Sequence, residues 1–86
     1  MNEELEVGMM VQCVSPYDSI LKGMTGRIVH IHPHGYPAWG VEWEGLEGGH
    51  NCEGNCPSGK GWYVDRDNIA YLDTGVSLKV WRELNT

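Results

Sequence analysis

The sequence predicts an all-β fold, a small five-stranded antiparallel barrel with a long glycine-rich loop between its third and fourth strands. Apolar and polar residues alternate in short runs, which is the period of a half-buried strand. Twelve glycines and four prolines in 86 residues separate these runs by frequent turns. Four tryptophans, four tyrosines and no phenylalanine supply bulky side chains that suit strands. A chain of this length is expected to form one domain, residues 1–86.

The first three strands are predicted at residues 9–14, 25–32 and 39–44, separated by turn-forming segments. The third run alternates most clearly. Trp39, Val41 and Trp43 share one face, and Glu42 and Glu44 share the other. The apolar face is therefore expected inside the barrel and the glutamates outside.

The second half of the chain contains two shorter strands and a tail. After the loop of residues 45–61, a strand is predicted at 62–64, a single helical turn at 65–69 and a last strand at 70–72. The tail, residues 73–86, fits both a strand alternation and a helical spacing, and we interpret it as an extended segment packing on a barrel core of residues 7–72. The predicted core draws on all five strands: Val11, Cys13, Ile28, Val41, Trp43, Trp62, Val64, Ile69 and Leu72.

Charge and cysteine content restrict the classes of function. The net charge is −6, and all of this excess lies in residues 1–57. Phosphate-binding surfaces need concentrated positive charge, so a nucleic-acid partner is disfavoured and a protein partner favoured. No apolar run is long enough to span a membrane and the first residues are not a signal peptide, so a cytoplasmic location is expected. Three cysteines cannot close a disulfide set, which leaves free thiols or a metal site.

Several motifs resemble those of SH3-like barrels. Val7-Gly8-Met9-Met10-Val11, then Gly23-Met24-Thr25-Gly26-Arg27-Ile28-Val29, follow the V-G-x-x-V and G-x-x-G-x-I-V elements of KOW-type, Tudor-like and mind-bomb-type barrels. The later Gly48-Gly49-His50 and Gly59-Lys60-Gly61-Trp62-Tyr63-Val64 are similar to a signature of small SH3-like proteins encoded by bacteriophages and prophages. The resemblance covers residues 7–72 and implies an SH3-like barrel in the cytoplasm of a bacterial host. The chain departs from it by a cysteine pair in the loop and by Tyr63 at a tryptophan position.

The loop also has a spacing typical of metal ligands. His50, Cys52 and Cys56 provide nitrogen and sulfur donors of the kind that zinc prefers in a tetrahedral site. The alternative is a glycine-rich loop with incidental thiols and no cofactor. A zinc site would need a fourth ligand from elsewhere in the chain, and the candidates are His30, His32, His34 and Cys13.

His30 and His32 lie two positions apart in a predicted strand, so they should share a face. We interpret that face as the solvent side, with Val29 and Ile31 on the core side. A metal-binding or pH-sensing role for these histidines has no further support in the sequence.

Three aromatic residues at or beside predicted turns could line a peptide-binding groove together with Trp62: Tyr17, Tyr36 and Trp39. The resemblance implies such a groove, because SH3-like barrels often bind peptides between the first long loop and the loop after the third strand. Glutamates 42, 44, 47 and 53 would favour a basic or proline-rich peptide there. The alternative is that Glu42 and Glu44 belong to an ordinary solvated strand face.

A catalytic role is not expected. The only nucleophile and base in proximity would be a loop cysteine with His50, and no phosphate-binding motif opens a helix. The sequence therefore predicts a non-catalytic module, a phage or prophage accessory protein that binds another protein through its acidic face and the 45–61 loop. The alternatives are a nucleic-acid-associated KOW or Tudor-like barrel and a small zinc-binding protein.

Overall fold

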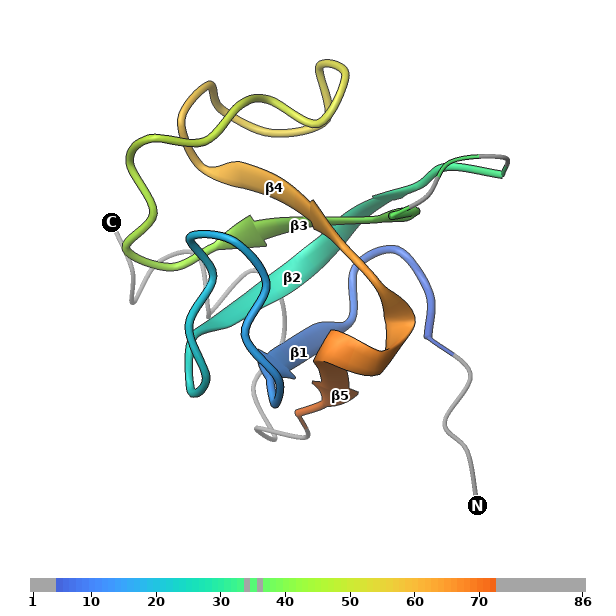
Figure 1. Ribbon diagram of the computed structural model, residues 1–86. Coiled ribbons are helices and arrows are strands. Elements are labelled where there is room, and N and C mark those ends of the chain that lie inside the picture. Colours follow the sequence, from blue (N-terminus) through green and yellow to red (C-terminus); the bar gives the residue numbers. More distant parts are fainter. Residues whose placement is uncertain (1–4, 34, 36, 73–86) are drawn as a thin grey trace.

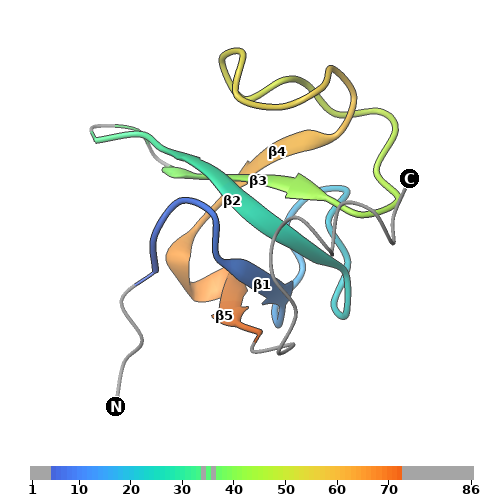
Figure 2. The ribbon, with the colours of Figure 1, turned by 180° about the vertical axis from the view of Figure 1, so that it is seen from behind.

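The computed structural model describes residues 5–33, 35 and 37–72, which form five strands and one short 3₁₀ turn. The strands are β1 (Met10–Cys13), β2 (Thr25–Ile31), β3 (Trp39–Trp43), β4 (Gly61–Val64) and β5 (Ile69–Tyr71), and the turn η1 (Arg66–Asn68) lies between the last two. β3 and β4 occupy one end of the molecule and β1 and β5 the other, with the long β2 between them (Figure 1). Figure 2 shows the same arrangement from behind.

All five strands belong to one antiparallel sheet with the order β4-β3-β2-β1-β5. β4 and β5 lie at the two edges, and no ladder joins them within the described residues, so the sheet is open. The predicted all-β class, the five strands and the helical turn before the last strand are confirmed. Each strand begins and ends within one or two residues of its predicted position, because turn residues flank every apolar run.

One buried cluster forms the core on one face of the sheet. Val41 of β3 lies opposite Ile28 of β2, and the cluster also contains Trp43 of β3 and Val64 of β4. Trp43 is the largest fully buried side chain, and its indole Nε1–H donates to the carbonyl oxygen of Trp62 at 3.3 Å. Seven of the nine predicted core residues belong to this cluster, in which three buried residues outside the predicted strands also take part: Leu5, Ile20 and Leu46.

Two of the nine predicted core residues are less buried than expected. Trp62 packs against the cluster but is only partly buried, and Leu72, after the end of β5, is also partly buried. Leu72 still continues the β5 pairing, because its N–H donates to the carbonyl oxygen of Met10 at 2.9 Å.

A bulge in β2 changes which residues face the core. The register shifts between Ile28 and His30, so that Ile28 lies opposite Val41 while Ile31 lies opposite Trp39. Ile28 is in the core cluster and Ile31 packs against it, whereas Val29 is buried outside the cluster. Val29 is buried and Ile31 packs against the cluster, so the prediction that both contribute to the core is confirmed, although the extra residue in the strand breaks the regular alternation.

Asn68 connects the short turn η1 to the segment between β1 and β2. Its Oδ1 accepts the N–H of Asp65 at 2.9 Å, and its Nδ2 donates to the carbonyl oxygen of Ser15 at 2.9 Å. The side chain is 8% exposed, so these bonds replace contacts with water. Asn68 therefore fixes the turn between β4 and β5 to the segment between β1 and β2.

Three expectations fall outside the part of the chain that the structure describes. These are the packing of the tail, residues 73–86, the position of Tyr36 in the groove and that of His34 as a candidate fourth zinc ligand. Within the described residues, no helix has the length and apolar character needed to cross a membrane.

Replacing Asn68 by alanine is expected to destabilise the fold by about 2 kcal/mol, because buried partners in two segments lose their hydrogen bonds. Urea unfolding followed by tryptophan fluorescence measures this change. Asp67→Ala is the matched control, since Asp67 is exposed in the same turn, and its effect should stay within about 0.5 kcal/mol. Equal effects of the two substitutions would contradict the role given to Asn68.

Candidate functional site

The 17-residue connection between β3 and β4, residues 44–60, folds back against the sheet. Its two ends pair with each other, because Gly49 N–H donates to the carbonyl oxygen of Gly59 and His50 exchanges two backbone bonds with Gly61 at 2.9 and 2.8 Å. Leu46 enters the core cluster, and Cys52 is completely buried. Figure 1 shows this loop beyond β3 and β4, at the end of the molecule away from β5.

Cys52 and Cys56 occupy a space that two glycines leave free. On β3 and β4, Gly40 lies opposite Tyr63 and Gly61 opposite Glu42, on the face away from the core. A Cβ on Gly61 would lie 2.6 Å from Cys52 Sγ and 2.7 Å from Cys56 Sγ, and one on Gly40 would lie 3.3 Å from Cys52 Sγ. The sulfur atoms therefore pack directly on the sheet backbone.

Residues 51–56 form a single tight turn around one carbonyl group. The oxygen of Asn51 accepts the N–H groups of Gly54, Asn55 and Cys56 at 3.1, 2.9 and 3.1 Å. Cys52 and Glu53 have positive φ angles of 48° and 59°, which cost a residue other than glycine about 1 kcal/mol each. The convergent hydrogen bonds and the burial of Cys52 hold this strained conformation.

The predicted metal ligands are neighbours, but they are already engaged with each other. Nδ1 of His50 accepts the backbone N–H of Cys52 at 3.0 Å, and the Cys56 thiol lies 4.0 Å from the carbonyl oxygen of His50, to which it donates. Burial, and after it the charge of Cys56, raises the pKa of Cys52 to about 12, and burial also raises the pKa of Cys56. Cys13 lies in the core cluster on the other face of the sheet. Among the residues that the structure describes, no group of three or more histidine, cysteine or acidic side chains is arranged to hold a metal ion, and zinc binding stays a prediction.

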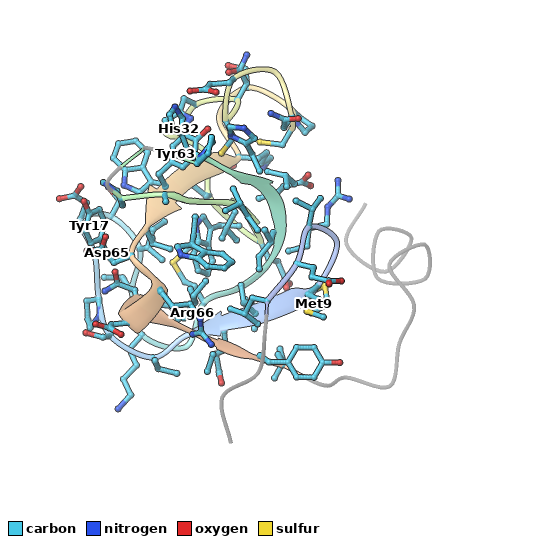
Figure 3. All side chains as sticks on the ribbon, turned by 90° about the vertical axis from the view of Figure 1, so that its right-hand side faces the viewer. Met9, Tyr17, His32, Tyr63, Asp65 and Arg66 are labelled. Atoms are coloured by element: carbon cyan, nitrogen blue, oxygen red, sulfur yellow. The ribbon has the colours of Figure 1, made fainter. Side chains whose placement is uncertain are left out.

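A polar cluster lies beside the thiols, where the loop meets β2 and β4. The carboxylate of Glu53 has one oxygen 3.7 Å from His30 Nδ1 and the other 3.8 Å from His32 Nε2. The Tyr63 hydroxyl is 2.7 Å from His30 Nδ1, and its ring stacks on His50 at 5.4 Å between centroids. Burial, then the charges of Glu53 and the two thiols, raises the pKa of Tyr63 to about 12. Figure 3 places His32 and Tyr63 at this end of the molecule, and Met9 and Arg66 at the opposite end.

The three glutamates predicted to bind a partner differ in their surroundings. Glu42 Oε1 accepts from Arg27 Nη2 at 2.7 Å, and both side chains are largely buried. Glu44 is exposed and accepts from Thr25 Oγ1 at 3.0 Å, and Glu47 is also exposed. Glu44 and Glu47 therefore keep the acidic surface that the sequence predicts, whereas the charge of Glu42 is compensated inside the protein.

The described aromatic residues of the predicted groove are all half-buried against the core but have different neighbours. The guanidinium carbon of Arg66 lies 5.9 Å from the centre of the Trp39 ring. Trp62 has its ring 5.2 Å from that of His50. Tyr17, in the segment between β1 and β2, exchanges two backbone hydrogen bonds with Ile20. A peptide-binding role for these three residues stays a prediction.

Sequence reasoning did not assign a place in the site to Tyr63 or Arg27. Tyr63 had a usable signal, because it follows the inward-facing Trp62 in a strand and so must point away from the core. Arg27 had none, because its partner depends on the register between β2 and β3. His30 was expected on a solvent face. It lies on that outer face but is half-buried by its contacts with Tyr63.

No protein-family model, curated protein or solved structure matches this chain.

Gly61→Ala is expected to destabilise the protein by roughly 2 kcal/mol, because the new methyl group would overlap both loop sulfurs. Gly48→Ala is the control, since no atom lies within 4 Å of the corresponding position in the same loop. In a Cys52→Ala/Cys56→Ala background, the penalty at Gly61 should shrink. An unchanged penalty in that background would show that the sulfurs do not set the constraint.

Stability is expected to fall at alkaline pH because of Cys52 and Tyr63. In the unfolded chain these groups ionise at ordinary pKa values of 9.0 and 10.0, and in the folded protein at about 12. Their contribution to the free energy of unfolding is therefore complete below pH 9 and is lost as the pH rises toward 12. Urea unfolding at about pH 8 and about pH 11 should show a steeper decline for the natural chain than for Cys52→Ala/Tyr63→Phe. Identical declines would contradict these assignments.

Proposed function

We propose that this protein is a non-catalytic SH3-like module that binds a protein partner through the loop of residues 44–60. The strand order β4-β3-β2-β1-β5, with a 3₁₀ turn between β4 and β5, supports the SH3-like part of the proposal. The motif resemblance to small phage and prophage proteins supports an accessory role in a bacterial host.

The observation that carries the proposal is the internal order of the loop. Leu46 and Cys52 are buried anchors, and the turn around the Asn51 carbonyl fixes the backbone between them. The side chains of Glu47, Glu53 and Asn55 remain exposed on this framework. A surface that is already ordered loses little conformational entropy on binding, which favours recognition of a partner.

The charge of the loop indicates the chemistry of that partner. Residues 44–60 contain three glutamates, Glu44, Glu47 and Glu53, against the single cation Lys60. The three carboxylates are exposed and would attract a segment rich in lysine or arginine. They would repel the phosphates of DNA or RNA, which argues against the KOW or Tudor-like alternative.

The chemistry of the thiols supports a binding role over a catalytic one. Nδ1 of His50 accepts a backbone N–H and not a thiol proton. With a pKa of about 12, Cys52 carries almost no thiolate at neutral pH. A nucleophile activated by a base is therefore not assembled at this position.

Affinity capture from a bacterial lysate treated with nuclease tests this proposal. Protein partners retained by the natural chain should be lost with Glu44→Lys/Glu47→Lys, because the reversed charges repel a basic segment. Glu6→Lys/Asp67→Lys is the matched control, since it changes the net charge equally at exposed positions outside the loop, and it should retain them.

Equal capture by both variants would overturn the assignment to the loop. Binding to DNA or RNA that weakens steeply with added salt would instead support the nucleic-acid alternative.

A further inference from the structure

The two loop cysteines form a pair that is separate from the third cysteine. Both sulfurs lie within 2.7 Å of one point, the position that a Cβ on Gly61 would occupy. Cys13 is buried in the core cluster, where its thiol faces the carbonyl oxygen of Ser15 at 3.2 Å. A reaction between Cys52 and Cys56 therefore needs no rearrangement of the sheet.

We infer that Cys52 and Cys56 are a redox modification site, which closes to an intramolecular disulfide on reaction with a small-molecule disulfide. The tight turn at residues 51–56 carries the inference, because its hydrogen bonds to the Asn51 carbonyl bring positions 52 and 56 to the same side of the backbone. The loop is thus organised around a thiol pair that meets over Gly61.

The two thiols differ in accessibility, which sets the order of the steps. Cys56 is half-buried, whereas Cys52 is fully buried. The Cys56 thiolate attacks the small disulfide, forms a mixed disulfide and releases one thiolate. Cys52, after losing its proton, then attacks the Cys56 sulfur and displaces the second small thiolate. The protein loses two electrons and two protons, and the small disulfide is reduced to two thiols.

The disulfide would add a covalent restraint to the loop without changing which side chains the loop exposes. In the reduced protein the turn is held by hydrogen bonds and by the packing of Cys52 on Gly40 and Gly61. In the oxidised protein a covalent bond also closes the segment from 52 to 56, in which the side chains of Glu53 and Asn55 are exposed. The inference does not depend on the proposed partner, because it concerns the loop of the isolated chain.

Equilibration of the full chain in mixtures of reduced and oxidised glutathione tests this inference. The equilibration is carried out in native buffer or in urea, and each sample is then denatured in acid before its free thiols are trapped with N-ethylmaleimide and counted by mass spectrometry. The natural chain should lose two of its three free thiols without dimerising, and dithiothreitol should restore them. The equilibrium constant should be at least about tenfold larger in native buffer than in urea, because the folded loop holds the sulfurs together.

The variants make the outcome specific. Cys13→Ala should still form the disulfide, whereas Cys52→Ala and Cys56→Ala should not. Equal equilibrium constants in native buffer and in urea would overturn the inference, and so would a persistent mixed disulfide with glutathione. Oxidation that begins only after a chelator removes bound zinc would also overturn it and would support the predicted metal site.

Discussion

The structure depends on the burial of β3 on both faces. On one face Val41 and Trp43 pack into the core, and on the other the loop of residues 44–60 covers Gly40 and Glu42. A strand in this position must satisfy two different environments with alternating side chains. On the core face β3 carries the large apolar residues. On the outer face it carries Gly40 and Glu42, and the carboxylate of Glu42 needs a partner.

The pairing of Arg27 with Glu42 follows from this constraint. The Glu42 side chain is only 17% exposed, and a carboxylate removed from water without a counter-charge would be costly. The register between β2 and β3 places Arg27 directly opposite Glu42, and the resulting bond is 2.7 Å long. Nε of Arg27 is buried without a partner among the described residues, so this pair does not satisfy every polar atom. The ion pair therefore offsets the cost of burying the Glu42 carboxylate under the loop, and it is not the main source of the stability of the sheet.

The loop is ordered despite its length because it makes several small contacts that are buried. Fixing a segment of this length carries a large entropic cost, about 1 kcal/mol or more for each residue. Leu46 in the core offsets part of this cost, and so do the sulfurs on Gly61 and the hydrogen bonds to the Asn51 carbonyl. Since these contacts all point inward, the acidic and amide side chains of the tip are left on the surface. The same inward packing places the two thiols beside each other, which connects the proposed binding surface to the inferred redox chemistry.

Local patterns in the sequence determined the strands, the turn before β5 and most of the core, because alternation and turn residues act over a few positions. They also identified His50, Cys52 and Cys56 as one candidate site, since all three lie within seven positions of one loop. Only the tertiary structure decided that Glu42 is paired with Arg27, that Ile28 and Ile31 both lie at the core although they are three positions apart, and that His30 contacts Tyr63. These outcomes depend on a bulge, on strand register and on the face over which a long loop folds. Each is set by contacts between residues far apart in the chain, which no local pattern records.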